Sequence, residues 1–319
     1  MVSGSAVRKI DLGGVTRKSP ARTRSALPLA VTAWAVLVCL VGQVAQPGFV
    51  DFRYFWHAGL AISHGLDPYV LVDNLPGKYP LYYPGPAVLV LAPFGLLPIR
   101  VAWVAWAALG GLVYGLACQR YGRGLAVGCL SAGFLEAVIY GQWSPLIVGA
   151  AVVPWLAGLV AAKPSIGTAL FAWRPDARTV WAGLGLTAAS LVVMPSWPRE
   201  WLHSLTQANQ VAPVLRPWGW ILVFAGLRWR TPEGRLLFVL ALIPQTTALY
   251  ETLILFLIPR NRYEGYGLAG LSFVAAIVQG EWVHGVTIEA GLAARWPVIF
   301  SLIWLPALAL VLAPRRFPD

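Results

Sequence analysis

The chain carries little charge, because Asp, Glu, Lys and Arg together make up only 12% of its 319 residues. A soluble domain typically carries about 25% of these residues, so this composition argues against an ordinary soluble protein. The chain is instead 58% hydrophobic and holds 16 Trp residues, and its mean hydropathy is +0.67. Such a sequence predicts an all-α, polytopic membrane protein in the cell membrane, with aromatic residues partly marking the interfaces.

Cysteine is also scarce. Cys39, Cys118 and Cys129 all lie within apolar runs and have no metal-ligand spacing. They are expected to be small core residues, neither a disulfide framework nor a metal site. The chain contains no GxxxxGK[ST] motif, so nothing in it indicates ATP hydrolysis. We expect no cofactor, although a divalent ion stays open as the less favoured alternative.

The net charge of +11 comes largely from basic residues at the start of the chain and in small clusters between apolar runs. This distribution follows the positive-inside rule and does not predict nucleic-acid binding. Residues 1–25 are expected to form a disordered cytoplasmic tail. The run Ala26–Gln46 is long enough to cross from inside to outside; the alternative, a cleaved signal peptide, lacks a convincing cleavage site before Asp51.

Residues 26–314 are therefore predicted to form a single transmembrane domain, with external loops at about 47–83 and 195–217. Many later apolar runs are shorter than the roughly 20 residues of a full crossing, and prolines interrupt them. We expect about nine to eleven membrane elements, several of them broken. Two full crossings between Tyr83 and Cys118 would place Arg120 outside. Either one run does not cross, or Arg120 and Arg123 break the charge rule.

The segment after the first span begins with a carboxylate. Asp51 is placed at the membrane boundary, ahead of a stretch in which Trp56 and Leu60 alternate with His57 and other polar residues. This pattern predicts an external amphipathic helix lying in the interface. A carboxylate at the mouth of a membrane bundle is costly and usually functional. The alternative is that Asp51 only caps a helix starting at Phe52.

A set of short motifs follows in a fixed order: DFRYFWHAG at 51–59, GLDPY at 65–69, YYPGP at 82–86, GQWSP at 141–145, AKP at 162–164, NQ at 209–210 and QTTALYE at 245–251. In order and spacing the chain resembles the GT-C superfamily of membrane glycosyltransferases, most closely glycosyltransferase family 87. The resemblance runs from residue 51 to about residue 260. It implies a GT-C-like bundle that uses a polyprenyl-phosphate sugar.

Three positions depart from the family pattern. Gly85 separates two prolines that are usually adjacent, Trp143-Ser144 displaces an Asn, and Tyr250-Glu251 stands where the family often has His or Asp near an aromatic residue. These departures keep open a non-catalytic scaffold derived from a transferase fold. A lipid-linked-sugar flippase is a second alternative. Against the flippase, the sequence shows no two-halves repeat, and we expect no acidic residue to be buried in the middle of a span.

The resemblance implies transfer of a mannose- or arabinose-like sugar to a glycolipid or glycan acceptor on the external face, by an inverting displacement. Such a reaction needs a general base, for which Asp51 is the candidate, and groups that hold the departing phosphate. The candidate donor-binding residues are Arg53, His57, Lys78, Gln142, Lys163, His203, Asn209, Gln210, Arg216, Tyr250 and Glu251. Their alternatives are ordinary: Arg216 as a solvated loop charge, Lys163 snorkelling to an interface, and His57 as part of the interface helix.

Tyr69, Tyr82 and Tyr83 are expected to form an aromatic belt, with sugar stacking as the alternative. A shared polar cavity is predicted among Asp51, His57, Gln142, Lys163, His203, Asn209 and Tyr250.

Overall fold

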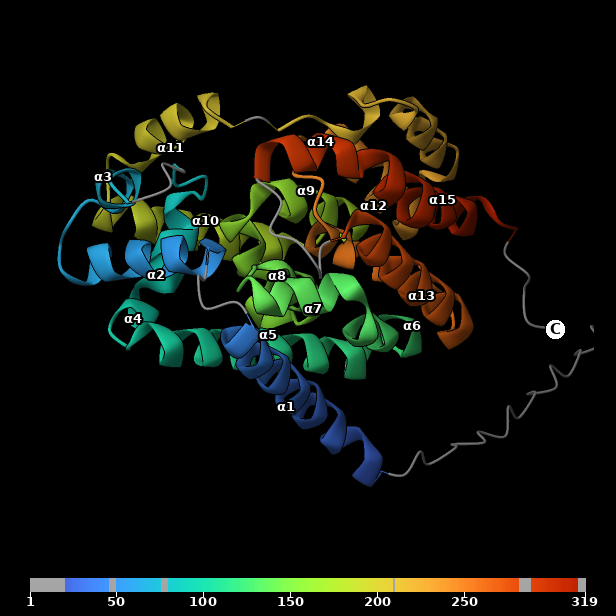
Figure 1. Ribbon diagram of the computed structural model, residues 1–319, viewed down its shortest axis with the longest axis horizontal. Helices are drawn as coiled ribbons and strands as arrows, with labels where there is room; N and C mark the ends of the chain where they lie inside the picture. The colour runs from blue at the N-terminus through green and yellow to red at the C-terminus, as the bar shows by residue number, and fades with distance from the viewer. Residues whose placement is uncertain (1–20, 46–49, 76–79, 209, 281–287, 315–319) are drawn as a thin grey trace, which may run out of the picture.

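The computed structural model describes residues 21–45, 50–75, 80–208, 210–280 and 288–314 (Figure 1). This part of the chain is mostly helical and contains no β-strand; its only β-pairing is an isolated bridge between Val211 and Gln245. The prediction of an all-α protein is therefore confirmed for the described residues.

The bundle is built on two long antiparallel helices, α1 (Ala21–Ala45) and α5 (Ile99–Tyr121). Gln43 near the end of α1 donates to the carbonyl of Arg100 at the start of α5, at 3.2 Å. Further along, a Cβ added to Gly115 of α5 would lie 2.7 Å from Pro28 of α1, so the small residues of α5 let the two backbones approach closely. The end of α5 thus lies beside the start of α1.

Among the residues that the structure describes, three helical stretches are long and apolar enough to cross a membrane: Ala26–Ala45, Ile99–Tyr121 and Ala294–Leu312. The last stretch combines α14 (Ile288–Ile299), a π-helical turn η6 (Phe300–Trp304) and α15 (Leu305–Leu312). Two bent pairs could raise the number to five. The described residues thus support a multi-pass membrane protein with three to five candidate crossings. Several of the other apolar runs form short or broken helices, as the sequence predicted.

One of these short helices settles the connection between Tyr83 and Cys118. Helix α4 (Gly85–Gly95) has 11 residues and is about 16 Å long, roughly half the thickness of the hydrocarbon core. It packs along α2 (Val50–Ser63) through Gly59 and Gly95. Because α4 is too short to cross on its own, α5 is the next helix after α1 that is long enough to cross, and Arg120 in its last turn lies at the same end of the bundle as the start of α1.

The bent pairs contain the breaks that the prolines predicted. Helices α7 (Ala132–Ile139) and α8 (Ser144–Val152) meet at 115°, and α10 (Ala177–Val193) and α11 (Trp197–Thr206) meet at 101°. In the first break Gly141 has φ +65°, a backbone conformation that glycine adopts readily. Helix α11 falls within the predicted loop 195–217, and the Trp201 indole donates to the carbonyl of Tyr82 at 3.0 Å.

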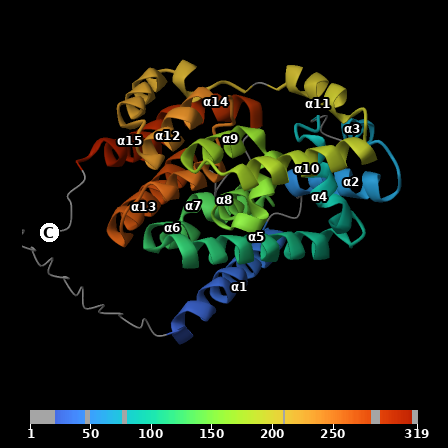
Figure 2. The same cartoon turned by 180° about the vertical axis from the view of Figure 1, so that it is seen from behind.

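The remaining elements are short except for α13, which has 18 residues, and three of the 3-10 helices are unusually long for that conformation. They are α3 (Pro68–Asp73), α6 (Arg123–Val127), η1 (Gly128–Leu130), η2 (Pro154–Ala162), α9 (Pro164–Trp173), η3 (Pro213–Leu215), η4 (Gly219–Arg228), α12 (Pro232–Leu242), η5 (Leu249–Leu257) and α13 (Arg262–Gln279). Figure 2 shows α7 and α8 in the middle of the bundle, between α5 and α9. Helix η5 packs against α7 and is buried along most of its length.

Arginine-bearing segments gather at the end of the bundle where α5 finishes. Tyr121 donates to the carbonyl of Leu257 at 2.8 Å and its ring contacts that of Trp173, with centroids 5.2 Å apart. Arg235 in turn donates to the carbonyls of Ala172 and Trp173. This basic end of the bundle is also the end that carries the start of α1.

Candidate polar site at the Asp51 end of the bundle

Asp51 lies in the first turn of α2 and accepts a hydrogen bond from the side chain of Gln142. The distance from Gln142 Nε2 to Asp51 Oδ2 is 2.6 Å. Gln142 follows Gly141 at the break between α7 and α8, where a Cβ on Gly141 would lie 2.6 Å from the Phe52 ring. The break is thus pressed against α2 next to Asp51. Because α2 begins at Val50, the hypothesis that Asp51 caps a helix starting at Phe52 is wrong, although its charge still favours a helix N-terminus.

Asp51 is partly exposed as a residue, but its carboxyl group lies within the bundle. Burial raises the pKa of Asp51 to about 6, against the opposing effects of the hydrogen bond from Gln142 and the positive charge of Lys163. A carboxyl group with this pKa changes its charge close to neutral pH, as a general base must be able to do.

Lys163 and Glu251 form a buried ion pair beside Asp51. Lys163 Nζ lies 2.7 Å from Glu251 Oε1, and the two side chains are 9% and 5% exposed. Lys163 sits between η2 and α9, whereas Glu251 belongs to η5, so two unusually wound segments meet here. Thr246 donates to the same carboxylate oxygen at 3.2 Å. The snorkelling alternative for Lys163 is therefore wrong, since its ammonium is paired inside the protein.

Two tyrosine rings join the ion pair to Asp51. Lys163 Nζ lies 5.8 Å from the centre of the Tyr83 ring and 5.4 Å from that of Tyr250, within the range of cation–π attraction. The Tyr83 hydroxyl donates to Gln142 Oε1 at 3.4 Å. We call Asp51, Tyr83, Gln142, Lys163, Tyr250 and Glu251 the polar cluster.

The aromatic-belt expectation fails at two of its three tyrosines. Tyr83 belongs to the polar cluster, and Tyr69 is buried with its hydroxyl donating to the carbonyl of Tyr83 at 2.8 Å. Both rings pack inward because α3 and the segment before α4 fold over α2. Asp67 starts α3 by accepting from the backbone amides of Tyr69 and Val70.

Glu136 is a further acidic residue of the site that the sequence analysis missed. It lies in α7, is 5% exposed, and its Oε2 accepts from the backbone amide of Tyr250 at 3.1 Å. The expectation that no acidic residue is buried within an apolar run is therefore wrong. The signal was available, because a lone acid inside the run 125–140 is costly in a membrane bundle and usually functional.

Other predicted site residues lie elsewhere or outside the described residues. Arg53 is exposed; His57 is half-buried against the Trp56 ring, and burial, together with the charge of Arg53, lowers its pKa. His203 is exposed on α11. Its charge opposes the effect of burial, which raises the pKa of Asp73. Arg216 lies over the Trp296 ring at 5.7 Å, and Gln210 is half-buried. Lys78 and Asn209 lie outside the described residues.

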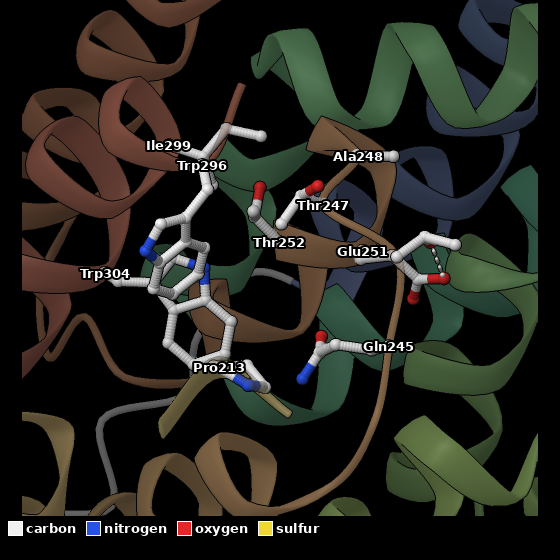
Figure 3. Close-up of a pocket in the computed structure, with 10 residues that line it drawn as sticks. Pro213, Gln245, Thr247, Ala248, Glu251, Thr252, Trp296, Ile299 and Trp304 are labelled. Atoms are coloured by element: carbon white, nitrogen blue, oxygen red, sulfur yellow. Dashed lines mark hydrogen bonds between the residues drawn. The ribbon is translucent and has the colours of Figure 1, made fainter. Parts of the chain in front are cut away.

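A small cavity adjoins the polar cluster on the far side of Glu251 (Figure 3). Its lining comes from the segment 245–252, Pro213, Trp296, Ile299 and Trp304. The cavity measures about 10 Å³, room for roughly one water molecule. Glu251 Oε2 is buried and has no hydrogen-bond partner in the described part of the chain. A sugar does not fit in this volume, so the cavity by itself is not a sugar site.

In the described segments no group of three or more His, Cys, Asp or Glu residues is placed to hold a metal ion. Metal dependence is therefore a question for an assay.

No family model, curated protein or solved structure matches the chain. The resemblance to glycosyltransferase family 87 thus stays a prediction that rests on the motifs alone. Within its described residues the protein is all-α, with three to five helices or helix pairs able to cross a membrane and a polar cluster at one end of the bundle.

Proposed function

We propose that the protein is a membrane glycosyltransferase that moves a mannose- or arabinose-like sugar from a polyprenyl-phosphate donor to a glycolipid or glycan acceptor. The observation that supports this proposal best is the carboxyl group of Asp51, whose pKa of about 6 is combined with a hydrogen bond to Gln142 and a nearby ammonium. The reaction would take place on the membrane face opposite the N-terminal tail, where α1 ends.

Asp51 acts as the general base in this proposal. It removes the proton of the acceptor hydroxyl while that oxygen attacks the anomeric carbon of the sugar, and the bond between this carbon and the phosphate oxygen breaks. Gln142 donates to one carboxylate oxygen and so fixes the orientation of the base. The single displacement inverts the anomeric carbon.

Lys163 is the cation placed to hold the departing phosphate. An ammonium is a compact charge well suited to a phosphate oxygen, and the Tyr83 and Tyr250 rings beside it offer flat surfaces for a sugar. Lys163 forms an ion pair with Glu251 at 2.7 Å. When the donor binds, the ammonium must therefore contact both the Glu251 carboxylate and the donor phosphate.

A lipid-linked-sugar flippase is the second candidate. Buried acidic residues on broken helices are typical of transporters, and Glu136 and Glu251 are both 5% exposed. The flippase would move the donor across the bilayer without breaking the sugar–phosphate bond. The two functions therefore differ in a product that can be measured.

The deciding experiment measures sugar transfer from a radiolabelled polyprenyl-phosphate sugar in membranes that contain the protein. Asp51→Asn keeps the size of the side chain but cannot accept the proton, so transfer should fall by about 10²- to 10⁴-fold. The parent protein should also lose activity as the pH drops below about 6, where Asp51 becomes protonated.

Asp67→Asn is the matched control. Asp67 lies in the same segment and caps α3, a role that Asn fills equally well, so this variant should retain parental activity. Equal activity of Asp51→Asn and the parent would exclude Asp51 as the base. In proteoliposomes, translocation of the intact donor without transfer would instead support the flippase.

A further inference from the structure

A second cavity opens at the basic end of the bundle, far from the polar cluster. It measures about 310 Å³ and is lined by Arg228, Thr231, Glu233, Ile258, Arg260, Leu310, Val311, Ala313 and Pro314. Three segments therefore build it: the end of η4 with the start of α12, the end of η5, and the end of α15. A cavity of this volume falls within the range of small-ligand sites.

Its two arginines are held in place by the end of α15. Arg260 donates to the carbonyls of Leu310 at 2.6 Å and Ala313 at 3.2 Å, and Arg228 donates to that of Leu312 at 3.0 Å. A guanidinium carries five N–H donors, more than these carbonyls accept. Both groups are thus fixed by the backbone and retain the capacity to bind an anion.

The charge and the walls of this cavity indicate the ligand. Two arginines and Glu233 leave one net positive charge on the lining, which matches the single negative charge of a phosphodiester. Ile258, Leu310 and Val311 supply an apolar wall. A nucleotide would bring several negative charges and little apolar surface, whereas a phospholipid brings one phosphodiester and acyl chains.

The position of the cavity agrees with such a ligand. Arg228 and Arg260 lie at the end of the apolar stretch Ala294–Leu312, the depth at which a lipid phosphate is found. Basic pockets between membrane helices on the cytoplasmic side bind anionic headgroups, and this end of the bundle carries the start of α1.

We propose that this cavity binds the headgroup of an anionic phospholipid, with its phosphodiester between Arg228 and Arg260. The ligand holds η4, η5 and α15 together at the cytoplasmic end of the bundle. This inference does not depend on the proposed transferase activity.

The test uses the full chain in detergent and measures the retention of phosphatidylglycerol by native mass spectrometry and by titration. The Arg228→Gln/Arg260→Gln double variant removes two positive charges and should weaken the binding of phosphatidylglycerol about 30-fold. Arg230→Gln is the matched control, because Arg230 is exposed, lies two residues from Arg228 and does not line the cavity; its affinity should be parental.

Because the double variant also removes contacts to α15, Ala313→Trp provides a second test. It fills the cavity with an indole, leaves both arginines in place, and should abolish lipid retention. Parental binding in either altered protein would overturn the proposal. So would competition of inorganic phosphate or ATP with phosphatidylglycerol at equal concentration, because the cavity would then be a site for a free phosphate compound.

Discussion

The buried ion pair allows a quantitative prediction about stability. In Lys163→Met the Glu251 carboxylate would keep only the hydroxyl of Thr246 as a donor to Oε1, while Oε2 already lacks a partner in the described part of the chain. Removal of one member of a buried pair costs about 3–5 kcal/mol because the other charge stays buried. We expect Lys163→Met to lower the free energy of unfolding by about 4 kcal/mol.

Glu251→Met should cost less, about 3 kcal/mol, because Lys163 retains attraction to the Tyr83 and Tyr250 rings. The double variant replaces both charges with apolar side chains of similar length, and such replacements are often close to neutral. It should therefore lie within about 1 kcal/mol of the parent, far from the sum of the single effects.

The free energies can be measured by unfolding in mixed micelles with a rising fraction of denaturing detergent. Arg230→Met, at an exposed position, is the control and should change stability by less than about 0.5 kcal/mol. A double variant as unstable as the sum of the two single variants would show that Lys163 and Glu251 contribute independently, and the argument from the ion pair would fail.

Two further predictions concern Asp51 and the contact between α2 and α4. Because the pKa of Asp51 is raised from 3.8 to about 6, the folded protein keeps this proton at pH values where the unfolded chain has lost it. Its contribution to the free energy of unfolding therefore falls by about 2 kcal/mol as the pH rises from 4 to 7, after allowance for partial exposure. Asp51→Asn should thus gain about this much relative to the parent between these pH values in thermal unfolding, and a difference that does not change with pH would contradict the pKa. Gly95→Ala places a Cβ 2.2 Å from the backbone of Gly59 and should destabilise the protein by about 2 kcal/mol. The control is Gly267→Ala on α13, whose added Cβ has no atom within 4 Å; it should be neutral or stabilising by up to about 1 kcal/mol. Similar melting temperatures for the two variants would refute the close approach of α2 and α4.

The sequence predicted the class of the protein and the first helix because both follow from long apolar runs and their flanking charges. It also selected Gln142, Lys163 and Glu251 as site residues. It could not predict that Lys163 pairs with Glu251, since these residues are 88 positions apart and meet only after η2 and η5 pack in the bundle. That contact depends on tertiary structure, which leaves no periodic trace in a single sequence.

The ambiguity between Tyr83 and Cys118 had a different origin. An apolar run of about 14 residues is too short for an upright crossing but long enough for a buried helix, so its length alone does not decide between the two. The structure adds two facts: the helix in this run has only 11 residues, and its Gly95 packs against Gly59 of α2. Glu136 could have been predicted as a site residue, since its position within an apolar run is plain in the sequence.

The length of α4 has a consequence for every later part of the chain. The number of crossings before a given loop is either odd or even, and this parity alone fixes the compartment in which the loop lies. Were α4 extended by about nine residues of apolar sequence, to the roughly 20 residues of a full crossing, it would add one passage, and each downstream segment would exchange its compartment. The arginines after α5 would then be directed to the outer surface against their charge preference. The length of this 11-residue helix thus determines whether the number of crossings before each later loop is odd or even.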